Sequence, residues 1–211
     1  MDPKELHYET LAKTVISNLE KRNMEAYYCK TSREAVEKAL SMLPSGAVVA
    51  HGGSMTLEES GMISALRNAN IRFLDRATCK TPEDSKKIFH DALNADYYFM
   101  STNALTIDGE LVNIDGNGNR VAALIYGPEN VILLVGMNKI AVNEAEAIQR
   151  VHATATPMNC QRLMKKTPCT ATGVCADCLS PDCICNQVVI TRRSGTKGRI
   201  KVILIGEELG Y

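Results

Sequence analysis

An excess of charge of either sign is missing from this chain of 211 residues. It contains 24 Lys and Arg against 24 Asp and Glu, so its formal net charge is zero. Neither a basic patch nor an acidic tail interrupts this balance. The composition therefore argues against a protein that binds nucleic acid.

Long hydrophobic runs are missing as well. The longest, VILLVGM, has the length of a strand and falls short of the roughly 18 apolar residues of a membrane span. The opening MDPKELHYETLAK shows no apolar core of a signal peptide, and no internal repeat is found. We therefore expect a cytoplasmic protein without a membrane span, folded as a single domain over residues 1–211.

The chain does contain a regular alternation of short apolar strands and amphipathic helices. This alternation predicts an α/β fold with a mostly parallel sheet flanked by helices. The stretch ALTIDGELVNI interrupts it as a hairpin, with a type I′ turn at Asp108-Gly109. Strands are predicted at 26–29, 47–50, 71–74, 97–101, 131–135, 188–191 and 200–205, and helices at 5–22, 31–43, 82–94, 119–126 and 143–155.

A glycine-rich turn, HGGS, follows a buried strand and opens a helix. Gly52 and Gly53 carry no Cβ, so backbone N–H groups there can approach a ligand closely. The helix N-terminus and the hydroxyls of Ser54 and Thr56 favour a carboxylate or phosphate. Thr56 and Glu59 form a capping-box pattern. The alternative interpretation is a tight strand-to-helix turn without a ligand.

The loop IDGNGNR places Asp115, Asn117 and Asn119 at alternate positions, as in a calcium-binding loop. However, Arg120 occupies the position of the required glycine, and Tyr126 that of the bidentate glutamate. The pattern therefore predicts a polar turn before a helix, with Asn119 as the N-cap.

Four further side chains are candidate contacts for an anion near the ends of strands. His51 ends the strand before the glycine turn, where open α/β sheets collect ligands. Arg120, Lys139 and Arg150 carry positive charge in or after polar turns. Their alternative is solvated surface charge, and for His51 a structural role.

Cysteine is concentrated in one stretch, since six of the eight lie within residues 160–185. A reducing compartment disfavours a disulfide framework. Structural zinc sites use two separated cysteine pairs, whereas this run has a single C-x2-C and resembles the dense runs that hold iron–sulfur clusters. An iron–sulfur cluster is favoured, with zinc or disulfides as alternatives. The candidate ligands are Cys169, Cys175, Cys178 and Cys185, with Cys183 and Cys160 in reserve.

Several segments together resemble the LUD-domain family of lactate-utilization proteins, from about residue 5 to residue 211. The matching segments are AHGGSMTLEESG, STNALTIDGELVNIDGNGNRVAALIYGPENVILLVGMNKI, EAEAIQRVHATATPMNCQRL, TPCTATGVCADCLSPDCICN and GRIKVILIGEELGY.

The resemblance implies a fold similar to ribose-5-phosphate isomerase, glucosamine-6-phosphate deaminase and the CoA transferases. The family is linked to oxidation of L-lactate to pyruvate by a complex that contains iron–sulfur proteins. Subfamilies with a cysteine-rich tail match this chain at the four candidate ligands, but Cys183 stands where an arginine is expected. The family motifs fall on Gly52, Gly53, Ser54, Thr56 and Glu59, on Thr102, Asn103 and Ala104, on Asp115, Gly118, Asn119 and Arg120, and on Gly136 and Lys139.

The sequence thus predicts a component of hydroxy- or oxo-acid redox metabolism. It would bind a small anion at Gly53, Asn103 and Arg120, and a [4Fe–4S] cluster through its C-terminal thiols. Expected partners are the substrate, other iron–sulfur redox subunits, and a second copy in a homodimer. The alternative is an assembly or regulatory subunit that holds structural zinc and catalyses nothing.

Overall fold

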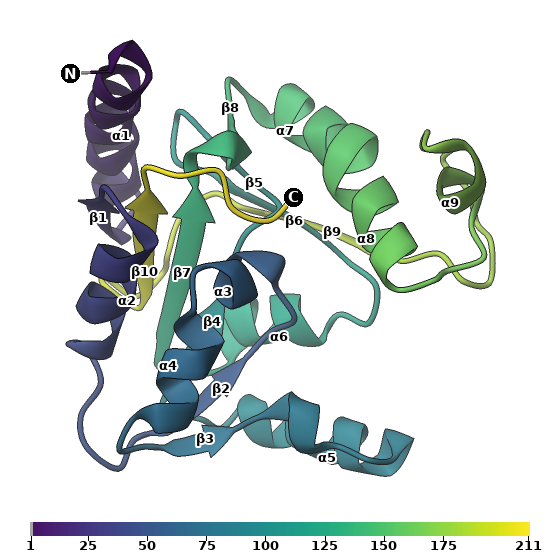
Figure 1. Cartoon of the computed structure of the whole chain (residues 1–211), viewed down its shortest axis with the longest axis horizontal. Helices are drawn as coiled ribbons and strands as arrows, with labels where there is room; N and C mark the ends of the chain where they lie inside the picture. The colour runs from purple at the N-terminus through teal and green to yellow at the C-terminus, as the bar shows by residue number, and fades with distance from the viewer. Residues whose placement is uncertain (1) are drawn as a thin grey trace.

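Two β-sheets form the framework of the chain in the computed structural model, which describes residues 2–211 (Figure 1). The larger sheet is wholly parallel, which confirms the predicted α/β fold. Its central strands are apolar throughout because both faces of the sheet are covered. In spatial order the strands are β1 (Glu25–Cys29), β10 (Ile200–Ile205), β7 (Asn130–Gly136), β4 (Tyr97–Met100), β2 (Val48–His51) and β3 (Arg72–Leu74).

Helices cover both faces of the large sheet. One apolar cluster joins its first face to α2, α3 and α4, and a second joins the opposite face to α1, α5 and α6. Within residues 2–211, every helix is too short or too polar to cross a membrane. The helices are α1 (Pro3–Lys21), α2 (Ser32–Leu40), α3 (Met55–Glu59), α4 (Met62–Asn68), α5 (Pro82–Ala92) and α6 (Asn119–Tyr126).

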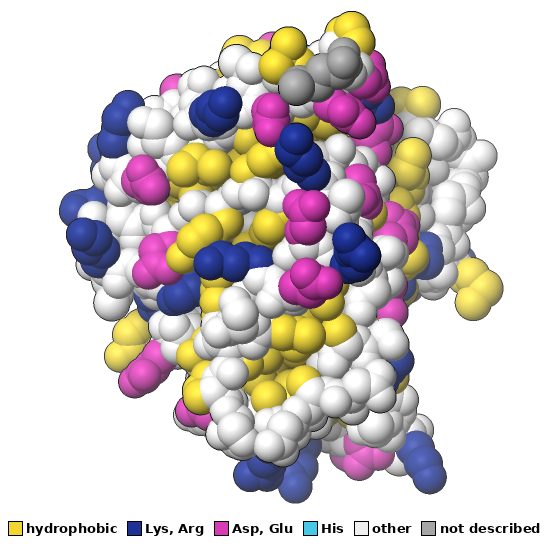
Figure 2. Space-filling model, turned by 60° about the vertical axis from the view of Figure 1, so that its left-hand side comes forward, with side chains coloured by type: hydrophobic (Ala, Val, Ile, Leu, Met, Phe, Trp, Pro, Cys, Tyr) yellow, Lys and Arg dark blue, Asp and Glu magenta, His cyan; other side chains and the backbone are white. Residues whose placement is uncertain are grey.

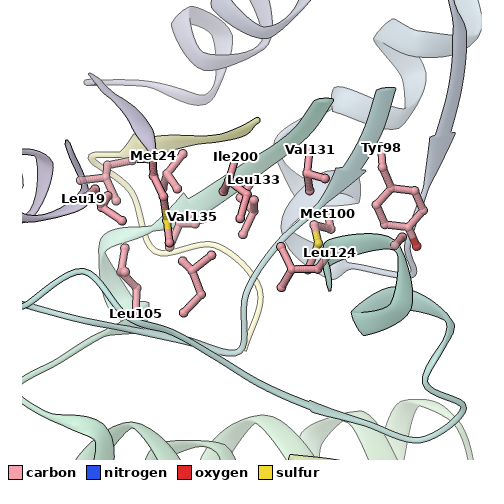
Figure 3. Packing of buried hydrophobic residues seen from close by; sticks show 14 of the residues in the cluster. Leu19, Met24, Tyr98, Met100, Leu105, Leu124, Val131, Leu133, Val135 and Ile200 are labelled. Carbon is pink, nitrogen blue, oxygen red and sulfur yellow. The ribbon is translucent and has the colours of Figure 1, made fainter. Parts of the chain in front are cut away.

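A second, four-stranded sheet packs beneath the large one. Leu105 of this sheet points toward Val135 and Leu133 of the large sheet, so the two sheets share one core (Figure 3). Its outer face is covered by a helix that runs from α7 (Glu144–Arg150) through a π-helical turn (Val151–Ala155) into α8 (Thr156–Arg162). The strands are β8 (Ile140–Ala141), β5 (Ala104–Thr106), β6 (Leu111–Asp115) and β9 (Gln187–Thr191).

The remaining elements are short. The helix α9 (Pro168–Thr172) projects beside α8 at the edge of the molecule (Figure 1), and two 3₁₀ turns follow β3 (Arg76–Thr78) and β7 (Met137–Lys139). On the face shown in Figure 2, Lys and Arg side chains are interspersed with Asp and Glu, as the balanced composition leads one to expect.

Three local predictions were wrong. The N-cap of α3 is Ser54, whose hydroxyl accepts from Leu57 N at 3.4 Å, because Thr56 points into the interior instead. The N-cap of α6 is Gly118, in the left-handed conformation, so Asn119 is already helical. The hairpin turn is not type I′, since Gly109 has a positive φ (+90°) and Asp108 does not.

The last residues form a strap across α3, which we define as residues 207–211. The Thr56 hydroxyl donates to Leu209 O at 3.1 Å, and the Glu59 carboxylate accepts from Gly210 N at 2.6 Å. Asn138 bonds the strap from the other side, donating to Gly210 O at 3.1 Å. Thr56 and Glu59, the predicted capping pair, therefore bond to the strap and do not cap the helix.

Gly210 allows the strap to lie close to α3. Its φ is +58°, and a Cβ there would lie 2.7 Å from Thr56 Oγ1. Gly46 offers a matched control, because it is also left-handed (φ +76°) but has open space around a Cβ. We expect Gly46→Ala to cost about 1 kcal/mol and Gly210→Ala clearly more, with faster hydrogen exchange in the strap. Equal losses in urea unfolding would contradict this packing.

Candidate functional site

A large cleft opens at the carboxyl ends of β2, β4 and β7. Its volume is about 660 Å³, within the range of small-molecule sites. Parallel strands bring their following loops to one edge of the sheet, where ligands of open α/β folds bind. The loops with the sequences HGGS, TNA and MNK all reach this cleft.

Six of the nine predicted ligand-binding residues line the cleft, and three do not. Those outside the lining are Gly52, Thr56 and Glu59, of which the last two hold the strap. The cleft-lining six are Gly53, Ser54, Asn103, Asn119, Arg120 and Lys139.

The two glycines of the HGGS turn leave room for arginine side chains. A Cβ on Gly52 would lie 3.3 Å from Arg120 Cδ, and a Cβ on Gly53 would lie 2.7 Å from Arg76 Nη1. The helix that follows, α3, is only five residues long, so its dipole contributes little. Positive charge at the turn comes mainly from guanidinium groups.

Arg120 ties the loops of the cleft together. Its side chain is 11% exposed, and its Nε faces Asp115 Oδ2 at 3.8 Å. Each Nη atom donates to two protein oxygens, so few of the guanidinium hydrogens are free for a ligand. The acceptors are Ser101 O (3.3 Å), Asn103 Oδ1 (2.9 Å), Ile114 O (3.0 Å) and Asn113 Oδ1.

Arg76 is a cleft residue that the sequence reasoning missed. It follows β3, and its guanidinium lies 5.3 Å from the Phe89 ring centroid. Within residues 2–211 no hydrogen bond or ion pair engages this guanidinium, so its donors can meet a ligand. The rule that placed His51 at a strand end applies equally to β3 and would have found it.

His51 is buried at the cleft wall, with 8% of its surface exposed. Its Nδ1 lies 3.0 Å from Gly52 O and its Nε2 lies 3.5 Å from Asp75 Oδ1, while Asp75 accepts from Arg67 Nε at 2.7 Å. Burial lowers the pKa of His51, and its two oxygen neighbours partly oppose this effect. Nδ1 is thus engaged by the backbone, whereas Nε2 is buried without a hydrogen-bond partner within residues 2–211.

Lys139 lies at the floor of the cleft with 4% of its surface exposed. Its Nζ donates to Ser101 Oγ at 3.2 Å and to Thr102 O at 3.4 Å. Burial, together with the nearby charges of Arg150 and Arg120, lowers its pKa to about 7. At neutral pH a substantial fraction of this amine is uncharged.

Positive side chains outnumber negative ones around the cleft, with six Lys and Arg against four Asp and Glu. Two of the acids are already paired, Asp75 with Arg67 and Asp115 with Arg120. The remaining charge favours an anionic ligand. The cations are Arg67, Arg76, Arg120, Lys139, Arg162 and Lys165, and the acids are Glu58, Asp75, Asp115 and Asp182.

The cysteine segment reaches the opposite wall of the same cleft. Cys183 is the cysteine that lines it, together with its neighbours Asp182 and Ile184. Cys185 N donates to Cys183 Sγ at 3.4 Å, and Cys185 Sγ lies 3.6 Å from Thr156 Oγ1, another cleft residue. A thiol held in reserve by the sequence prediction therefore faces the site directly.

Other thiols of the segment also have close neighbours. Cys175 Sγ lies 3.4 Å from His152 Nδ1 on the π-helical turn. Burial, together with Cys169 and Cys183 nearby, raises the pKa of Cys160 to about 11. Burial likewise raises the pKa of Cys185 to about 11.

All eight cysteines, which lie within the described residues 2–211, are free. No three His, Cys, Asp or Glu side chains in this range stand close enough to share one metal ion. The donor chemistry nevertheless fits a thiophilic metal, because residues 160–185 carry six thiols and His152 Nδ1 lies 3.4 Å from one of them, Cys175 Sγ.

The sequence profile of the LUD domain matches residues 12–205, more than nine-tenths of the chain. The chain belongs to the LUD-domain family. The resemblance drawn from the sequence motifs is thereby confirmed. No curated protein sequence gives a significant match.

One solved structure agrees with this LUD-domain assignment at the level of fold. A DUF162-family protein from Deinococcus radiodurans aligns over 94% of this chain and 98% of its own, with 11% identity and a TM-score of 0.56. Partial alignments reach ribose 5-phosphate isomerase A from Neisseria gonorrhoeae (54% of each chain, 16% identity, TM-score 0.34) and eIF2B delta from Chaetomium thermophilum (56% and 50%, 16% identity, TM-score 0.36).

The pKa of Lys139 predicts a specific dependence of stability on pH. An unfolded lysine binds its proton up to about pH 10.5, whereas the folded protein releases it near pH 7. The unfolded state binds more protons in this window, so Lys139 makes the fold more stable as pH rises. The difference in unfolding free energy between wild type and Lys139→Met should rise by on the order of 3 kcal/mol between about pH 6 and 9.5.

Urea unfolding at a series of pH values measures this difference. Lys13→Met on the exposed face of α1 is the control, and its difference from wild type should stay flat. A flat difference for Lys139→Met as well would show that the amine stays charged in the folded protein.

Proposed function

We propose that this LUD-domain protein binds a small hydroxy- or oxo-acid in the cleft and an iron–sulfur cluster in its cysteine segment. It would then act as a component in the redox metabolism of lactate-type acids. The single observation that supports this proposal best is that Lys139 and Cys183 line the same cleft. A redox role requires the acid and the electron carrier to be close.

The charges of the cleft support an acid as ligand. Arg76 has free donors beside Gly53, and a guanidinium matches the geometry of a carboxylate. Ser54 and Asn103 add polar groups on the neighbouring loops. A phosphate would meet the same donors, so the ligand class is a small carboxylate or phosphate.

The thiols support a metal, and the proposed ligands are Cys169, Cys175, Cys178 and Cys185, with Cys183 and Cys160 as the nearest substitutes. Metal binding would deprotonate thiols such as Cys185, whose pKa is raised in the metal-free fold. When bound, an iron–sulfur cluster supplies electron transfer, and its potential depends on nearby hydrogen bonds and solvent. Redox partner subunits would receive those electrons.

Metal content tests the proposal. Protein purified without oxygen should be brown, absorb broadly near ~400 nm and bleach on reduction. Cys175→Ser and Cys178→Ser should lose the metal, whereas Cys79→Ser, outside the segment, should retain it. Colourless protein with one zinc ion per chain would instead support a structural role in an assembly or regulatory subunit.

Arg76→Gln tests the anion site. We expect affinity for L-lactate and pyruvate to fall by about fivefold, equivalent to about 1 kcal/mol for an exposed ion pair. Arg72→Gln is the matched control, because Arg72 is exposed on β3 but does not line the cleft. Isothermal titration calorimetry measures both, and equal affinities in the two variants would remove Arg76 from the site.

A further inference from the structure

We propose that Lys139 captures the carbonyl group of a 2-oxo acid as an imine, which gives the cleft a covalent step beyond ligand binding. This inference rests on the proposed function, because it specifies which acids the cleft takes. An acid with a keto group next to its carboxylate would react, whereas a hydroxy acid of the same size would only bind.

The hydrogen bonds around Lys139 suit an uncharged amine. Ser101 donates its own hydroxyl hydrogen to Thr102 O at 3.3 Å, so Ser101 Oγ is an acceptor for Lys139. Together with Thr102 O this makes two acceptors for Nζ within residues 2–211. A neutral amine donates two hydrogens and keeps a lone pair, whereas an ammonium group has a third hydrogen to place.

The charges around Lys139 act in the same direction. No carboxylate lies within 4.0 Å of its Nζ in the described part of the chain. Arg150 and Arg120 both bind Asn103, in the loop whose residue Thr102 accepts from Lys139. Burial together with neighbouring cations is the established way to activate a lysine as a nucleophile, and it accounts for the pKa of about 7.

Glu59 is the neighbour that opposes this effect. Its charge raises the pKa of Lys139, but its carboxylate already accepts from Gly210 N at 2.6 Å. The backbone N–H of Gly210 in the strap therefore already occupies the Glu59 carboxylate. The strap also lies over the amine, since a Cβ on Gly210 would be 3.5 Å from Lys139 Nζ.

The chemistry balances without a co-reactant. The Lys139 lone pair attacks the keto carbon, the carbonyl oxygen takes up a proton, and a carbinolamine forms. Loss of water, which carries away the carbonyl oxygen and both amine hydrogens, leaves a C=N bond between Nζ and the former keto carbon. The carboxylate of the acid stays free to pair with cleft cations.

Reductive trapping tests the inference. The full-length protein, prepared without oxygen, is incubated with pyruvate and sodium borohydride, which reduces an imine to a stable secondary amine. Intact mass spectrometry should show one reduced pyruvate per chain, and peptide mapping should place it on Lys139. L-lactate, which has no keto group, should give no adduct.

Lys139→Arg keeps hydrogen-bond donors at this position but cannot form an imine, so it should lose the adduct. Lys13→Arg on α1 should keep it. Calorimetry of the wild-type protein with pyruvate and L-lactate distinguishes failure of the imine from failure of the proposed ligand class. Pyruvate that binds without a Lys139 adduct would overturn the imine and leave the proposed ligand class, whereas failure of both acids to bind would overturn both. An adduct spread over surface lysines would also overturn the imine at Lys139.

Discussion

The buried guanidinium of Arg120 is the constraint on which the cleft depends. It lies where the two sheets meet and bonds Ser101 O after β4 as well as Ile114 O in β6. An arginine placed this deep must satisfy its donors, because an unpaired buried charge is costly. The loops that supply the oxygens are consequently held in one arrangement, and a Cβ on Gly52 would crowd both the Tyr98 hydroxyl (3.1 Å) and Arg120 Cδ (3.3 Å).

The remaining features of the site follow from that arrangement. Asn103, fixed through Arg120, presents its carbonyl to Arg150, and Ser101 and Thr102 present their oxygens to Lys139. The helix that carries Arg150 continues through the π-helical turn to His152 and Thr156, which contact the thiols of the cysteine segment. One chain of contacts therefore runs from the cationic side chains of the cleft to the cysteine segment.

Much of the fold was predictable because its signals are local. Apolar runs such as 131–135 mark buried parallel strands, and alternation with helices implies one ligand edge for the whole sheet. The same rule predicts that the glycine turn, Asn103 and Lys139 meet at one edge of the sheet, and all three line the cleft. The family resemblance extended these expectations to the cysteine segment.

The rest depended on long-range contacts that no local pattern encodes. Thr56 and Glu59 match a capping box, but they bind a strap more than 150 residues away. Arg120 has the charge of a ligand contact, although its donors serve the protein. The role of Gly53 beside Arg76, and the position of Cys183 in the cleft, depend on how distant loops meet.

The central claim is that acid and metal share one cleft. Anomalous diffraction at the iron absorption edge, from crystals grown without oxygen in the presence of pyruvate, tests it most directly. We expect an iron peak bonded to thiols of the cysteine segment beside Cys183, and ligand density between Lys139 and Arg76 in the same cleft. An iron peak on the outer side of α9, or ligand density outside the cleft, would contradict it.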